Sequence, residues 1–312
     1  MCLTSEVSES SLRSDVSIKT IMVSKEQQAQ NLMAEAEKKL NSSKGFFGSL
    51  FGSTSKSEEV ADCYQRAGNL YKMVKKWSEA GDAFSRAANL HTKAGSRHDA
   101  AVCHLDAANS YKKSEPKEAV NCYLRAIDIY TDMGRFAIAA KHHQNIAEIY
   151  EANDEPQKAV QHFEQSGEYF RGEENHSSAN KCFLKVAHHV ALLENYEKAV
   201  EVYEDVARRS VDNSFLKYCT KEYLFRALLC HLCVDVVNAE LALERYVLMC
   251  PAFQDSRESK LIQSVLDSLE EQNVDAFTDA VQSYDSVSRF DSWYTTMLLR
   301  IKNTLSNRPD LR

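Results

Sequence analysis

A pattern of small and apolar residues recurs along the chain in steps of 20 residues, with one step of 19. Each copy has a small or apolar residue, a ring four positions later, and a second small or apolar residue three positions after the ring. Positions i, i+4 and i+7 lie on one face of an α-helix, so each copy predicts one amphipathic helix that packs closely through its small residues. The eight copies are Val60/Tyr64/Ala67, Ala80/Phe84/Ala87, Ala100/His104/Ala107, Ala119/Tyr123/Ala126, Ala139/His143/Ile146, Ala159/Phe163/Ser166, Ala179/Phe183/Val186 and Ala199/Tyr203/Val206.

Turn signals separate these copies. Gly95, Gly134 and Gly172 follow helical patterns, and Pro116 and Pro156 suit the first turn of the helices that come next. Helices of roughly fifteen residues joined by short turns are antiparallel neighbours, and two of them make one repeat of about forty residues. The sequence therefore predicts an all-α fold, a tetratricopeptide-like helical-hairpin solenoid whose repeat is longer than the standard one.

The repeat also divides the chain into three regions. Residues 1–24 are Ser-rich and aperiodic, and we expect a disordered N-terminal extension there. Residues 25–210 form the solenoid. Over residues 211–312 the strict spacing fades while helical patterns continue, which predicts a C-terminal helical bundle and tail.

Composition agrees with a helical protein. The chain has 312 residues, of which 44% are hydrophobic and 27% charged, with only 9 Gly and 4 Pro. No stretch approaches the ~20 apolar residues of a membrane-spanning helix, and the first residues lack the apolar core of a secretory signal, so we expect a cytoplasmic protein. Its nine cysteines are scattered through apolar segments and are interpreted as buried thiols in a reducing compartment. The net charge of -7 argues against a nucleic acid partner.

Formal charge differs between the two sets of helices. Alternate helices of a hairpin solenoid line opposite faces. Three helices of one set carry net charges of +1, +1 and +2, and three of the other carry 0, -1 and -1. The corresponding windows are 97–113, 135–150 and 176–193 for the first set, and 116–130, 156–170 and 196–210 for the second.

Two lysines of the first set occupy equivalent positions. Lys141 and Lys181 each come two residues after the small residue that starts their copy, Ala139 and Ala179. At about 100° per residue this spacing points both side chains away from the packed stripe. We expect a basic track suited to an elongated acidic partner, and an ordinary solvated face is the alternative. Seven histidines of the same set would add charge at lower pH: His98, His104, His142, His143, His176, His188 and His189.

The C-terminal region has the opposite sign. Between Asp255 and Asp291 nine acids and three bases give a net charge of -6. Glu270 and Glu271 end a helical pattern, where the helix macrodipole does not stabilise acids. Either the two acids have a functional role, or they occur there by chance.

Catalytic signals are weak. Cys230 and Cys233 form a single CxxC inside an apolar helix, which favours packing over a zinc site. The paired histidines have no carboxylate at metal-ligand spacing, and the sequence has no phosphate loop, nucleophile elbow or dinucleotide fingerprint. We therefore expect no enzyme activity, no metal and no cofactor.

An apolar loop lies between the first two predicted helices. The segment 44–53 places Phe46, Phe47, Leu50 and Phe51 among Gly and Ser, next to Lys44. These apolar side chains either pack against the first hairpin or enter a membrane interface, where anionic lipids attract the flanking Lys44. The second possibility predicts a peripheral membrane protein whose attachment is weak and reversible.

Several long strings make the sequence similar to a known family. They are GFFGSLFG, AVNCYLRAIDIYTDMGRFAIAAKHH, HSSANKC, EEQNVD, WYTTMLLRIKNTL and the terminal DLR. The chain resembles the soluble N-ethylmaleimide-sensitive-factor attachment proteins, alpha/beta type, from about Met22 to Arg312. The resemblance implies a twisted helical sheet with a C-terminal bundle. It also implies an adaptor that binds assembled SNARE complexes (syntaxin, synaptobrevin and partner SNAREs) and recruits and stimulates the hexameric ATPase N-ethylmaleimide-sensitive factor, which disassembles them during vesicle fusion.

The resemblance also implies roles for individual residues. The SNARE-binding basic residues are Lys113, Arg135, Lys141, Lys181, Lys185, Lys221 and Arg257. The ATPase-binding residues are Asp235, Asp267, Glu270 and Glu271, with Leu311 promoting ATP hydrolysis. The membrane-attachment residues are Phe46 and Phe47, to which the apolar loop adds Leu50 and Phe51.

The sequence departs from the family pattern in three places. Residues 1–21 precede the usual start, Asp267 stands where Glu is usual, and the tail before Leu311 lacks an acidic pair. The alternative function is a tetratricopeptide-type scaffold that binds a peptide carboxylate, as co-chaperones do.

Overall fold

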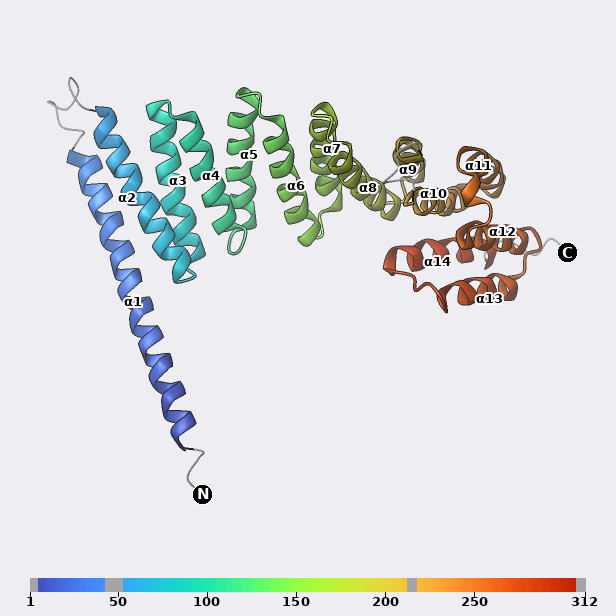
Figure 1. Ribbon diagram of the computed structural model, residues 1–312, viewed down its shortest axis with the longest axis horizontal. Coiled ribbons are helices and arrows are strands. Elements are labelled where there is room, and N and C mark those ends of the chain that lie inside the picture. Colours follow the sequence, from blue (N-terminus) through green and yellow to red (C-terminus); the bar gives the residue numbers. More distant parts are fainter. Residues whose placement is uncertain (1–4, 43–52, 212–217, 307–312) are drawn as a thin grey trace. The chain divides into compact units, whose positions relative to one another are not determined.

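The computed structural model describes residues 5–42, 53–211 and 218–306, with side chains over 20–42, 56–211 and 218–305 (Figure 1). Within these ranges the chain is built from α-helices, short turns and one 3-10 helix, and contains no strand. This confirms the all-α prediction. The chain divides into two compact units, Met1–Asn153 and Asp154–Arg312.

The first unit is a row of helices that alternate in direction, each packed against the next in the chain (Figure 1). Neighbouring helices are joined by turns of only a few residues from α2 onward, which makes them antiparallel hairpins. The helices are α1 (Ser5–Ser42), α2 (Ser53–Met73), α3 (Trp77–Ala94), α4 (Arg97–Tyr111), α5 (Pro116–Asp132) and α6 (Phe136–Ala152).

The second unit continues the repeat and adds a bundle. Helices α7 to α10 pack in sequence, and α10 then contacts α11, α12 and α14. The elements are α7 (Pro156–Gly172), α8 (His176–Leu192), α9 (Tyr196–Val211), α10 (Thr220–Val234), α11 (Val236–Met249), η1 (Pro251–Phe253), α12 (Arg257–Glu270), α13 (Val274–Asp285) and α14 (Ser292–Ser306).

The predicted stripe is the core. The first and third residues of all eight copies are buried, and so are the rings in seven copies; Phe183 is half-buried. Close packing is visible at Gly81, where an added Cβ would lie 2.5 Å from the ring of Tyr111. A glycine at this position therefore leaves the space that the Tyr111 ring fills.

The turns keep the same period of twenty residues. Gly95 and Gly134 have positive φ angles of 78° and 70° directly after a helix, as the glycine signals predicted. Asp154, Glu174 and Glu194 adopt the same left-handed conformation, with φ of 57°, 56° and 64°. No glycine occupies these three positions, so the sequence alone does not reveal which residue of each turn is left-handed.

Two boundaries differ from expectation. Helix α1 begins at Ser5, so residues 5–24 are helical, whereas 1–24 was expected to be disordered. Serine content gave that expectation, but the segment has no Gly or Pro to interrupt a helix. The boundary after residue 210 also does not separate the compact units, since α7–α9 belong to the unit that contains the bundle.

Side chains of α14 explain the second difference. The indole Nε1 of Trp293 donates to the backbone carbonyl of His188 at 3.2 Å. The guanidinium of Arg300 donates to the carbonyls of Ala191 and Leu192 at 3.0 and 2.8 Å, which satisfies the last turn of α8. The last repeat helices and the bundle are therefore held together by contacts far apart in sequence.

Candidate protein interaction surfaces

The basic residues of the first unit are exposed. Lys141 lies on α6 two residues after the buried Ala139, and Arg135 is the N-cap residue of the same helix. Neither has an ion-pair partner in the described parts of the chain. Lys113 follows the last turn of α4, and its ammonium lies 3.8 Å from the ring centroid of Trp77. These charges are directed to the surface and are not neutralised by a carboxylate within the unit.

In the second unit α8 repeats the arrangement of α6. Lys181 is exposed two residues after the buried Ala179, and it too has no ion-pair partner among the described residues. Lys185 is exposed one turn later, with its ammonium 6.0 Å from the ring centroid of Phe163. The prediction that Lys141 and Lys181 point away from the packed stripe is confirmed by their exposure.

The last two predicted basic residues differ from these. Lys221 is half-buried at the start of α10. The guanidinium of Arg257 donates to Ser288 Oγ at 2.8 Å and to the carbonyl of Tyr284 at 3.3 Å, and lies over the Tyr284 ring. Arg257 therefore joins α12 to the end of α13, and part of its hydrogen-bonding capacity is used inside the bundle.

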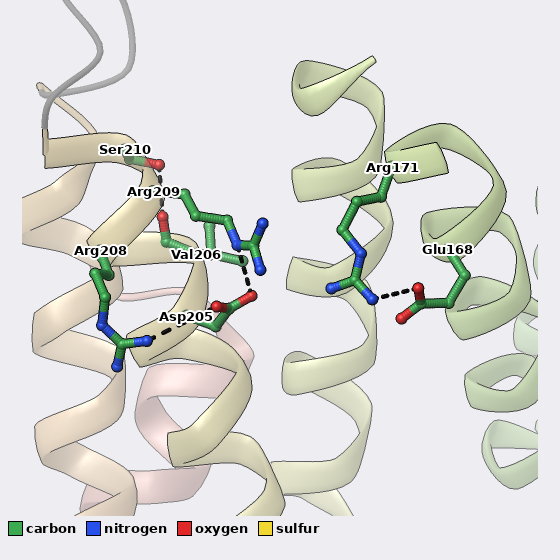
Figure 2. Close-up of polar contacts among 7 residues, drawn as sticks. All are labelled: Glu168, Arg171, Asp205, Val206, Arg208, Arg209 and Ser210. Atoms are coloured by element: carbon green, nitrogen blue, oxygen red, sulfur yellow. Dashed lines mark hydrogen bonds and ion pairs between the residues drawn. The ribbon is translucent and has the colours of Figure 1, made fainter. Parts of the chain in front are cut away.

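On α7 and α9, which belong to the other set of helices, three arginines are paired with carboxylates of their own helix. Figure 2 shows Arg171 paired with Glu168 on α7, and both Arg208 and Arg209 paired with Asp205 on α9. The two pairs on α9 have N to O distances of 3.9 and 2.9 Å. Because these arginines each meet a carboxylate on the same helix, their field is weaker than that of Lys141 or Lys181.

The histidines do not extend the basic surface as expected. Desolvation by burial lowers the pKa of His104, His142 and His188 to about 4. The ring of His142 stacks on Tyr123, and the ring of His188 stacks on Trp293. These three histidines are packing residues that take up a proton only near pH 4, so the expectation that they add charge to the basic face on mild acidification is wrong for them.

The acidic residues lie at helix ends. The carboxylate of Asp235 accepts from the backbone amide of Asn238 at 3.3 Å and caps the N-terminus of α11. Asp267, Glu270 and Glu271 are exposed at the C-terminal end of α12. Acids at a helix N-terminus are stabilising, whereas acids at a C-terminus oppose the macrodipole. Folding therefore accounts for Asp235 but gives no reason for the acids that end α12.

Within the described residues no group of three or more His, Cys, Asp and Glu side chains is placed to hold a metal ion. Burial raises the pKa of the Cys230 thiol, and raises that of Cys233 to about 11, as expected for packed cysteines. No helix in the same residues is long and apolar enough to span a bilayer.

The remaining predicted residues lie outside the described residues. They are Phe46, Phe47, Leu50, Phe51 and Leu311.

Sequence reasoning missed two features. One is Trp77, whose ring supports Lys113; the two residues are too far apart in sequence for any local pattern to pair them. The other is a second apolar face on α11, formed by Val237, Leu241 and Leu248. Their spacing of four and seven residues is visible in the sequence. Ala239 and its neighbours form an apolar face as well, so the sequence does not show that one of the two faces stays exposed.

The decisive comparison is with protein families. The model of the family described as "Soluble NSF attachment protein, SNAP" matches residues 27–306. The chain belongs to this family. It is 55% identical to the alpha-soluble NSF attachment protein of Homo sapiens over 290 residues, which cover 92% of this chain and 98% of that protein.

More distant relatives extend the match. The alpha-soluble NSF attachment protein of Vitis vinifera is 39% identical over 89% of this chain and 94% of its own length. The vesicular-fusion protein SEC17 of Komagataella phaffii is 35% identical over 91% of this chain and 97% of its own length. The SNAP family match therefore spans nearly the whole chain and both compact units.

Proposed function

We propose that this SNAP family member is an adaptor in vesicle fusion. It binds assembled SNARE four-helix bundles through its basic residues and recruits the ATPase NSF, N-ethylmaleimide-sensitive factor, through the acids of its second unit. The observation that carries the proposal is the family match over residues 27–306, together with relatives named for NSF attachment and vesicular fusion.

The exposed lysines support binding to an acidic helical bundle. Lys141 and Lys181 occupy equivalent positions on α6 and α8, and both are exposed without an ion-pair partner in the described chain. An exposed charge of this kind stays hydrated in the free protein. It attracts an acidic surface over about 8 Å at physiological ionic strength. Each compact unit thus offers one such lysine to an acidic partner.

The acids of α12 support recruitment of a basic partner. Asp267 and Glu270 oppose the macrodipole of α12, Glu271 follows them as its C-cap residue, and all three are exposed. An exposed acidic cluster is suited to steering a partner of opposite charge, which raises the association rate.

Two parts of the proposal rest on the sequence and the family resemblance. Phe46 and Phe47, with Leu50 and Phe51, attach the cytoplasmic protein peripherally to membranes. Leu311 contacts the ATPase and promotes ATP hydrolysis. The protein itself acts without a catalytic site or a cofactor.

A reconstituted reaction tests the proposal. The purified chain is mixed with soluble SNARE bundles, NSF and ATP, and bundle disassembly and ATP hydrolysis are followed. The chain is expected to be required for both. Leu311→Ala is expected to assemble the complex but not to accelerate hydrolysis. Phe46→Ser with Phe47→Ser is expected to spare soluble bundles and to impair membrane-embedded ones. A chain that binds short C-terminal peptides but no SNARE bundle would contradict the proposal.

A further inference from the structure

Helix α11 has two apolar faces, and only one of them is buried. Ala239, Leu243 and Tyr246 point into the second unit, whereas Val237, Leu241 and Leu248 are 57%, 55% and 82% exposed. At about 100° per residue, the three exposed side chains fall within roughly 20° of a line that runs opposite Ala239. We call these three residues the α11 stripe. Single exposed apolar residues are ordinary, but three on one line of a short helix form a patch.

The neighbours of α11 leave the stripe uncovered. On one flank Arg245 pairs with Glu204 of α9 at 3.3 Å, and Tyr246 donates a hydrogen bond to the same carboxylate at 2.6 Å. On the other flank α11 meets α12 across a groove of about 530 Å³ with a mixed lining: Leu243, Glu244, Val247 and Leu248 of α11, Gln254 before α12, and Ser259, Lys260 and Gln263 of α12. The stripe therefore lies on the outer surface of α11, with the groove beside it.

The stripe and groove are continuous with the acids assigned to NSF recruitment. Asp235 caps the helix that carries the stripe, two residues before Val237. Gln263 lines the groove and donates a hydrogen bond to Asp267 at 2.9 Å. The patch thus has acids at the start of α11 and on the next turn of α12, beyond the groove. A partner that fits it has an apolar surface bordered by basic residues that meet these acids, and it also accommodates Lys260 in the groove.

We propose that the α11 stripe forms the apolar centre of the NSF-docking surface, with the mixed groove beside it and Asp235 and Asp267 at its acidic rim. This inference rests on the proposed function, since it takes NSF as the occupant. Acids at a rim mainly set the association rate and its salt dependence, whereas a buried apolar centre sets the dissociation rate. The acids alone therefore do not hold the complex together; the stripe does.

The test compares two classes of variant on preassembled SNARE bundles, with NSF held in a non-hydrolysing nucleotide state. Leu241→Ser combined with Leu248→Ser removes the stripe. Asp267→Asn combined with Glu270→Gln removes rim charge. Val287→Ser is the matched control, because Val287 is 73% exposed in the same unit but lies after α13. Association and dissociation rates of NSF are measured at several salt concentrations, with SNARE binding and helicity as checks.

We expect the stripe variant to release NSF about tenfold faster, with an unchanged salt dependence of association. The charge variant is expected to associate more slowly and to lose part of its salt dependence, and Val287→Ser is expected to match the unmodified chain. A stripe variant that releases NSF at the unmodified rate overturns the inference while leaving the proposed function intact. The same holds if the variant loses only self-association, measured by sedimentation. Failure of the unmodified chain to bind NSF contradicts the proposed function itself.

Discussion

Neutralising the acids at the end of α12 is expected to stabilise the protein while weakening its function. Asp267 and Glu270 lie in the last turn, where unpaired carbonyl groups already carry partial negative charge. The double variant Asp267→Asn with Glu270→Gln removes two unfavourable interactions without changing side-chain size. The Asp267→Asn change keeps an amide oxygen that can accept from Gln263, so the existing 2.9 Å hydrogen bond is retained. We expect the double variant to be more stable than the unmodified chain.

The size of the effect follows from the position of the two charges. A charge at a helix end contributes about 0.3–1 kcal/mol, and exposure places both acids near the lower limit. Together they give about 0.6 kcal/mol, which corresponds to a rise of roughly 1–2 °C in the melting temperature of a unit of this size. Glu271 provides the matched control. It lies between the C-terminus of α12 and the N-terminus of α13, so the two helix dipoles oppose each other and Glu271→Gln is expected to change little.

Thermal unfolding followed by tryptophan fluorescence measures this effect. Each compact unit contains one tryptophan, Trp77 in the first and Trp293 in the second, so a Trp77→Phe background reports on the second unit alone. The gain is expected at about 0.01 M salt and should shrink at about 1 M, where charges are screened within roughly 3 Å. An unchanged or lower melting temperature at low salt would refute the macrodipole argument, and so would a gain that survives at high salt.

Two further predictions concern packing and titration. Gly81→Ala is expected to lower the free energy of unfolding by about 1–3 kcal/mol, because the new Cβ would lie 2.5 Å from the Tyr111 ring. The control Gly172→Ala meets nothing within 4 Å and should be neutral, and urea unfolding measures both variants. Burial lowers the pKa of His142 from 6.5 to about 4, so the unfolded chain binds more protons between these values. Stability should be complete above pH 6.5 and decrease as the pH falls towards 4, and the decrease should be shallower in His142→Gln. An equal pH dependence of stability in both proteins would contradict a contribution of His142 to the loss of stability at acid pH.

The helices and their buried faces were predictable because one physical rule repeats along the chain. Ala139 and Ala179 are buried, and the rule then also places Lys141 and Lys181 on the surface. A ring position does not reveal whether a histidine there is charged, and burial makes His104 a neutral packing residue.

The same rule does not predict contacts between segments that are far apart in the sequence. Arg257 bonds to Ser288, 31 residues away, and Arg300 bonds to the end of α8 across more than 100 residues. Such contacts depend on how helices pack, and they decide which basic residues stay available and which segments share a compact unit. The acids of α12 were visible in the sequence, and the structure adds that they are exposed at the helix end.

The central claim is that repeated, unpaired lysines bind a SNARE bundle. Its most direct test is the affinity of the chain for a soluble four-helix SNARE bundle at several salt concentrations. The comparison is between the unmodified chain, Lys141→Glu with Lys181→Glu, and Lys117→Glu, which reverses an exposed charge on α5 of the other helix set. The account predicts that binding weakens as salt rises, that the double variant loses binding with unchanged helicity and melting, and that Lys117→Glu binds normally. Salt-independent binding, or a double variant that binds like the unmodified chain, would contradict it.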